Sequence, residues 1–127
     1  MPIVSISINE RLLSELEKLQ DAMGYSGRSE AVRAGIRMLL QDARENEQLR
    51  GVLTGVLLVI HAHEAEDIVT DVKHRYTDVI HTQLHNKFQE GKCLELFILN
   101  GEAERIRELT RALKRNEENE YVKLVVI

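Results

Sequence analysis

The chain has 127 residues, of which 43% are hydrophobic and 30% are charged, with a net charge of −4 and a single cysteine. This composition predicts a folded protein of one ordinary or two small domains, and it excludes a disordered chain and an internal disulfide framework. No apolar run reaches the ~18 residues that span a membrane and the first residues are unlike a signal peptide, so we expect a cytoplasmic protein.

The N-terminal segment predicts one strand followed by two helices. Apolar and polar residues alternate over residues 3–8, as they do in a strand. Asn9 is a suitable cap for a helix over residues 10–23, and Gly24 is a suitable end for it. A second helix is predicted from residue 29 to residue 45. A short strand without a partner is unstable alone, so we expect two copies to pair their strands antiparallel in an obligate dimer.

The rest of the chain predicts a second domain after a charged linker. The expected strands cover residues 52–60, 79–88, 93–99 and 121–127, the helices cover 64–74 and 102–114, and turns fall at Glu90-Gly91 and Asn100-Gly101. This β-α-β-β-α-β order predicts a ferredoxin-like sandwich. The predicted fold class is therefore α+β, with a first domain over residues 1–45, a linker over 46–50 and a ferredoxin-like domain over 51–127.

Several residues of the first domain resemble the ribbon-helix-helix family of the CopG/MetJ type. They are Gly24-Tyr25, Arg28-Ser29-Glu30-Ala31 and Arg33. The resemblance implies that the paired strands enter the major groove of a double-stranded DNA operator, where Ile3, Ser5 and Ser7 face the bases. Arg28 and Ser29, at the start of the second helix, would then hold a phosphate. The alternative is a plain dimerisation ribbon whose serines face solvent.

The whole chain, from Val4 to the final strand, resembles the nickel-responsive repressor family NikR. The resemblance implies a homotetramer, a dimer of dimers, in which two ribbon-helix-helix dimers flank a core of ACT-like domains. In that family nickel is bound by a helix histidine of another subunit, a His-x-His pair on a strand and a cysteine on the next strand. These positions fall here on His74, on His85 and Lys87, and on Cys93, and Glu95 matches an acidic residue close behind the cysteine.

Lys87 departs from the family pattern, because an ammonium group has no lone pair with which to bind a metal. We therefore favour a pocket repurposed for an anionic or carbonyl-bearing small molecule, with His74 and His85 as hydrogen-bond partners. The alternative is a sensor of Ni(II) or another transition metal that uses His74, His85 and Cys93. Two other classes stay open: a constitutive DNA-binding module whose second domain only oligomerises, and a small-molecule-binding protein that no longer binds DNA.

The remaining polar residues are interpreted as structural. Single histidines on strands are more often exposed or buried in the core than ligands, so His61, His63 and His81 are set aside, although His61 and His63 could supply a ligand. The Glu95 carboxylate lies among apolar residues and needs a partner such as Lys87. No catalytic motif is present. The sequence thus predicts an effector-responsive transcription regulator, a repressor, and not an enzyme.

Overall fold

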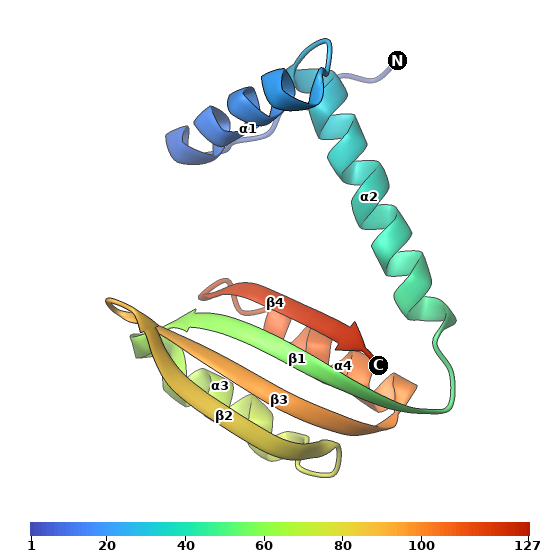
Figure 1. The fold of residues 1–127 in the computed structure, drawn as a ribbon, viewed down its shortest axis with the longest axis vertical. Coiled ribbons are helices and arrows are strands. Elements are labelled where there is room, and N and C mark those ends of the chain that lie inside the picture. The colour runs from blue at the N-terminus through green and yellow to red at the C-terminus, as the bar shows by residue number, and fades with distance from the viewer. The chain divides into compact units, whose positions relative to one another are not determined.

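A computed structural model describes residues 1–127, and the chain divides into two compact units. Unit 1 covers Met1–Gln48 and unit 2 covers Leu49–Ile127. Each unit is considered by itself below, and Figure 1 shows the elements of both. None of the helices combines the length and the apolar content that crossing a membrane requires.

Unit 1 contains the two predicted helices, α1 (Glu10–Met23) and α2 (Arg28–Gln48). The side chain of Asn9 accepts a hydrogen bond of 2.8 Å from the backbone N–H of Leu12, and Gly24 ends α1 with a φ of 74°. The predicted cap and stop are thus confirmed. Helix α2 continues three residues beyond the predicted end, into the segment expected to be a linker, because charged residues do not end a helix. Gly51, with a φ of 74°, follows shortly after it.

Unit 1 leaves most of its apolar side chains exposed in a single chain. Helix α1 buries no residue, and α2 buries only Ala31. Residues 1–9 form no strand here, and the apolar side chains Val4 and Ile6 are 81% and 65% exposed. An amphipathic helix is stabilised by burying its apolar face. The predicted strand and its pairing with a second copy, which would bury these faces, stay predictions.

Unit 2 is an antiparallel sheet with helices, in the predicted order. Its elements are β1 (Val52–Ala62), the short 3-10 helix η1 (His63–Ala65), α3 (Glu66–Arg75), β2 (Ile80–Gln89), β3 (Lys92–Glu102), α4 (Ala103–Lys114) and β4 (Asn119–Val126). The strands lie in the order β2-β3-β1-β4, and every neighbouring pair is antiparallel. The predicted β-α-β-β-α-β arrangement is therefore confirmed.

The two faces of this sheet have different surroundings. Helices α3 and α4 lie behind the sheet in Figure 1, and the core between them and the sheet includes Leu57, Phe97 and Leu109. No element of unit 2 covers the opposite face, which we call the open face. The side chains on the open face are mostly apolar: Val56, Leu58, Ile60, Leu84, Leu94, Leu96, Ile98, Tyr121 and Val125.

The prediction of a turn at Asn100-Gly101 is wrong, because β3 continues through both residues to Glu102. Both residues pair with β1, and the backbone N–H of Asn100 also donates to the carbonyl of Val79. A Cβ added at Gly101 would lie 2.5 Å from Cγ1 of Val79. The glycine therefore allows two segments to pack closely together, and it does not reverse the chain.

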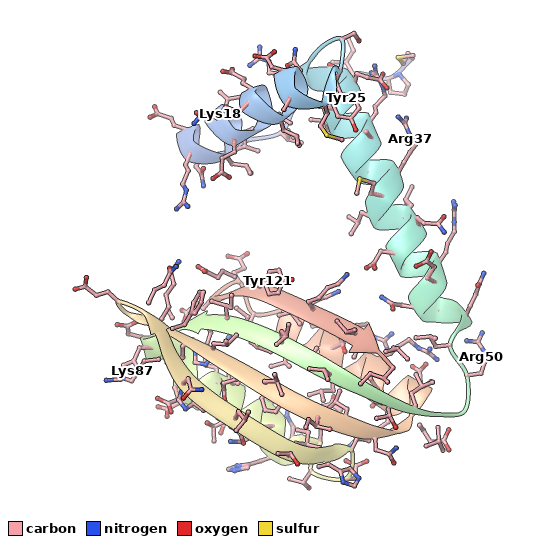
Figure 2. The ribbon with its side chains drawn as sticks, in the orientation of Figure 1. Lys18, Tyr25, Arg37, Arg50, Lys87 and Tyr121 are labelled. Atoms are coloured by element: carbon pink, nitrogen blue, oxygen red, sulfur yellow. The ribbon has the colours of Figure 1, made fainter.

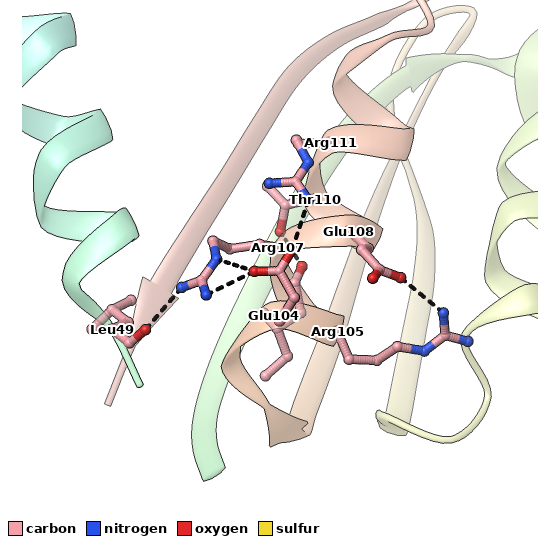
Figure 3. A network of polar contacts seen from close by, with 8 residues as sticks. Leu49, Glu104, Arg105, Arg107, Glu108, Thr110 and Arg111 are labelled. Carbon is pink, nitrogen blue, oxygen red and sulfur yellow. Dashed lines mark hydrogen bonds and ion pairs between the residues drawn. The ribbon is translucent and has the colours of Figure 1, made fainter. Parts of the chain in front are cut away.

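Residues of α4 donate hydrogen bonds to backbone carbonyls at the start of unit 2. Arg107 donates to the backbone carbonyl of Leu49 at 2.9 Å, and its guanidinium also bonds the Glu104 carboxylate (Figure 3). Arg111 donates to the other oxygen of Glu104. The N–H of Ala103, the first residue of α4, donates to the carbonyl of Gly51. The chain therefore enters β1 from a fixed point beside α4.

Candidate metal centre

Three neighbouring strands bring polar side chains together on the helix-covered face of the sheet. In the strand register, Cys93 on β3 lies opposite His61 on β1 and opposite Lys87 on β2. Glu95, two residues along β3, lies opposite His85 on β2. Directly opposed residues share a face, with Cβ atoms about 5 Å apart. Strand register thus gathers residues from three separate segments at the β2–β3 hairpin end of the sheet.

His61, His85 and Cys93 can offer their ligand atoms to one metal ion. One donor atom from each residue lies within 4.8 Å of the others. For comparison, a nitrogen and a sulfur atom bound to one tetrahedral zinc ion, at about 2.1 and 2.3 Å from it, are about 3.6 Å apart. His61 and Cys93 are 0% and 1% exposed, whereas His85 is more accessible. The cluster is thus close to a ligand set, with two buried donors and one reachable from solvent.

Glu95 is held by His61 and Gln83, and the prediction that Lys87 is its partner is wrong. One Glu95 carboxylate oxygen lies 2.7 Å from Nε2 of His61, and the other accepts from the Gln83 amide at 2.8 Å. Lys87 lies two residue pairs away in the register, opposite Cys93. Nδ1 of His61 lies 2.7 Å from the carbonyl oxygen of Ala62, so this nitrogen carries a proton and donates it.

The Cys93 thiol is surrounded by groups that keep its proton on. Burial raises its pKa, and the carboxylates of Glu66 and Glu95 raise it further, while the charge of Lys87 opposes them. Nδ1 of His63 lies 3.7 Å from the sulfur and also 3.7 Å from Glu66. Without a metal, Cys93 is therefore a protonated thiol at neutral pH.

Lys87 is exposed and lines a pocket beside the cluster. Figure 2 shows its side chain at the edge of unit 2, near the hairpin between β2 and β3. The pocket has a volume of about 340 Å³. Its lining residues are His63, Glu64, Lys87, Gln89, Glu90, Gly91, Lys92 and Cys93. An ammonium group at this edge can stay in solvent, away from an ion held between His61, His85 and Cys93.

Two of the histidines considered from the sequence lie outside the cluster. His74 is exposed near the end of α3 and is not among the grouped ligand atoms. His81 falls at a register shift between Ile80 and Thr82, so the alternation that would have put it on the face of His85 is interrupted. A β-bulge of this kind re-aims a side chain.

The residues predicted to contact DNA are all accessible in unit 1. Ile3 is 96% exposed, and Ser5 and Ser7 are exposed as well. Arg28 and Ser29 are the first two residues of α2, where free N–H groups favour an anion. The Arg28 guanidinium lies 3.9 Å from the carboxylate of Glu17 on α1, so Glu17 competes with a phosphate for Arg28. Their contact with DNA stays a prediction.

The sequence interpretation considered His61 as a possible ligand but set it aside, and it did not consider Gln83 or Glu66. His61 was set aside because a single histidine on a strand is more often exposed or buried in the core than a ligand. One available signal was alternation along the first strand, which puts His61 on the same face as Val59. A second signal was Glu95, because a carboxylate in an apolar strand needs a buried partner. A histidine at the end of the neighbouring strand can be that partner.

The donor set fits a transition metal. Two imidazoles and one thiolate are intermediate to soft ligands, which suit nickel, zinc, cobalt and copper better than magnesium or calcium. Metal-bound histidines commonly donate their other ring N–H to a carboxylate or a backbone carbonyl. His61 has one of each. A ferredoxin-like domain with a candidate transition-metal centre is the class of protein that the fold and this cluster define.

Comparisons with known proteins agree with this class. The family model described as "NikR C terminal nickel binding domain" matches residues 54–127. The chain is 37% identical to a protein of Methanocaldococcus jannaschii named "Putative nickel-responsive regulator", over 100% of this chain and 92% of the relative. A protein of Methanococcus aeolicus with the same name is 34% identical over the same shares. The chain belongs to the NikR family, and these relatives are named as regulators and not as enzymes.

A comparison of structures supports the fold of unit 2 only. The solved structure of an uncharacterized protein from Thermotoga maritima matches with a TM-score of 0.56 and 16% identity. The match covers 61% of this chain and 99% of the other chain. At this level of identity the likeness concerns the arrangement of strands and helices.

Proposed function

We propose that the protein is a nickel-responsive transcription regulator, a repressor that binds a double-stranded DNA operator through unit 1 and Ni(II) through unit 2. The observation that carries this proposal is the grouping of His61, His85 and Cys93 at the β2–β3 hairpin end of the sheet. The names of the relatives at 37% and 34% identity support nickel as the ion.

The sequence favoured a small-molecule effector in place of a metal, and none of the comparisons supports that preference. One observation keeps it as a second candidate. The pocket of about 340 Å³ beside Cys93 is lined by two lysines, Lys87 and Lys92, which attract an anion. However, Lys92 is already paired with Glu120 at 2.9 Å, so one of these charges is largely neutralised. We therefore prefer a metal over a small molecule as the effector.

Unit 1 is proposed to bind DNA as a ribbon-helix-helix dimer. Its support is the exposed apolar surface of α1, α2 and residues 1–9, which a second copy would bury. Paired strands would then present Ile3, Ser5 and Ser7 to the major groove, with Arg28 and Ser29 on phosphate.

A homotetramer is proposed from the open face of unit 2. Monomeric proteins rarely expose a continuous apolar surface of this kind. Leu84, Tyr121 and Val125 on this face are each about half exposed in the single chain. Metal bound in such a core would shift the placement of the two DNA-binding dimers, and operator binding and metal binding would then be linked.

Calorimetric titration tests the proposal. Purified metal-free protein is titrated with Ni(II) and, separately, with a panel of small carboxylates and amino acids. DNA fragments selected by the protein are then tested for binding with and without the effector found. We expect tight Ni(II) binding that Cys93→Ala abolishes, and DNA binding only with Ni(II). Binding of a metabolite without Ni(II) supports the second candidate, and DNA binding independent of any effector supports a constitutive module.

A further inference from the structure

We propose that His61 is the third protein ligand of the metal centre and takes the role that Lys87 cannot fill. This inference rests on the proposed function, since it concerns how this chain binds the ion. Its starting point is the cluster of ligand atoms from His61, His85 and Cys93, in which His61 and Cys93 are buried and His85 is exposed.

The strand register explains how one residue can replace the other. Cys93 lies on β3, between β2 and β1, with Lys87 opposite on one side and His61 opposite on the other. Directly opposed side chains on one face are close enough to share a ligand. An imidazole on β1 therefore reaches the surroundings of the Cys93 sulfur as well as an imidazole on β2 would. The ligand lost from one neighbouring strand is supplied by the other.

The bonds of His61 prepare its ring for this role. Nε2 lies 2.7 Å from Glu95, and Nδ1 lies 2.7 Å from the carbonyl oxygen of Ala62. The ring has only two nitrogens, so binding a metal replaces one of these bonds and keeps the other. The remaining bond fixes the orientation of the ring, as outer-shell partners of metal-bound histidines do. Gln83 holds the Glu95 carboxylate in turn.

The charge at Lys87 is compatible with this arrangement. Lys87 is exposed at the edge of unit 2, whereas His61 and Cys93 are buried. The ion would therefore be bound over β3, between donors from β1 and β2, while the exposed ammonium group stays in solvent. All three protein donors then come from β1, β2 and β3 of one chain, so this part of the site needs no residue from another copy.

The test measures Ni(II) affinity of the full-length protein by competition with a chelator, together with the thiolate-to-nickel charge-transfer absorption. The variants are His61→Asn, the double variant His61→Asn/Lys87→His, and His81→Ala as a control on β2 outside the cluster. Circular dichroism confirms that each variant is folded. We expect His61→Asn to lose more affinity than the roughly 10–100-fold that an outer-shell partner is worth. We expect the double variant to recover most of that loss and His81→Ala to change nothing.

A second measurement keeps the test valid if His61→Asn does not fold. In the wild-type protein titrated with diamagnetic Zn(II), one ring nitrogen resonance of His61 should move strongly, while those of His81 stay in place. If wild type binds Ni(II) tightly and neither the His61 resonance nor the affinity of His61→Asn changes, His61 is not a ligand and the inference is wrong. If wild type itself does not bind Ni(II), the proposed function fails first.

Discussion

At the scale of single residues, Cys93 decides how the centre responds to pH. Burial and three nearby carboxylates raise the pKa of its thiol, so the proton is still present at neutral pH. A metal binds the thiolate and must displace that proton. As the pH rises toward the raised pKa, less work is needed to remove it, and metal affinity must increase.

We therefore predict that Ni(II) affinity rises with pH between 6.5 and 8, by up to about tenfold per pH unit for each proton displaced. Competition titrations in two buffers of different ionisation enthalpy measure both the affinity and the protons released. An affinity that stays flat over this range would contradict a protonated thiol at Cys93.

Gly101 offers a second test at this scale, on stability. An alanine there would place its Cβ 2.5 Å from Cγ1 of Val79, and overpacking of this kind costs about 1–3 kcal/mol. Val79→Ala removes the clashing methyl but leaves a cavity. We predict that urea unfolding shows a double variant much less destabilised than the sum of the two single variants. Simple additivity would mean that the two side chains do not meet.

At the scale of elements, Arg105 on α4 ties down the turn between α3 and β2. It bonds both carboxylate oxygens of Asp78, at 3.0 and 3.2 Å, and donates to the carbonyl of Arg75 at 2.7 Å. Its guanidinium also stacks 4.3 Å from the centre of the Tyr76 ring and bonds Glu108, the latter contact being visible in Figure 3. The hydrogen bonds from Arg105 lower the pKa of Asp78.

The lowered pKa of Asp78 gives a directional prediction. A group whose pKa is depressed in the folded state contributes stability above its unfolded pKa, and this contribution is lost as pH falls through the folded pKa. In the variant Arg105→Gln we expect the Asp78 carboxyl to titrate close to the ordinary value of about 3.9. Carbon-detected NMR titration of both proteins measures the change. Equal pKa values in wild type and variant would show that Arg105 does not hold this carboxylate.

The elements were largely predictable because their signals are local. Alternation, helical periodicity and the caps at Asn9 and Gly24 predict the strand and helix order of the chain. The turn expected at Asn100-Gly101 failed because a glycine used for close packing has the same sequence signature as one used for a turn. The packing partner, Val79, lies just before β2, and the residues around Gly101 give no indication of this contact.

The site was predictable only where its residues are close in the chain. His85 and Cys93 fall on adjacent strands of one hairpin, so their meeting follows from the turn at Glu90-Gly91. His61 is far from both in sequence, and its place beside Cys93 depends on the register of β1 against β3. Register between distant strands is set by packing of the whole sheet and is only weakly encoded in any one segment.

At the scale of the whole molecule, association of copies is the main expectation. Unit 1 lacks a core of its own in one chain, and the open face of unit 2 is apolar. We predict that Leu96→Lys, which puts a charge in the middle of the open face, converts tetramers to dimers held by unit 1. Analytical ultracentrifugation measures the change. A lysine introduced on the exposed side of α3 by Asp71→Lys, which changes the charge by two units, should leave the tetramer intact. Tetramers that persist in Leu96→Lys would exclude this face as the interface.

The central claim is that nickel controls DNA binding through the cluster at His61, His85 and Cys93. The most direct measurement is fluorescence anisotropy of a selected DNA fragment against metal-free protein, with Ni(II) or with a chelator, for wild type and Cys93→Ala. We expect saturable binding by wild type only when Ni(II) is present and none by Cys93→Ala in either condition. Equal binding with Ni(II) and with chelator, or nickel-dependent binding that Cys93→Ala retains, would contradict the claim.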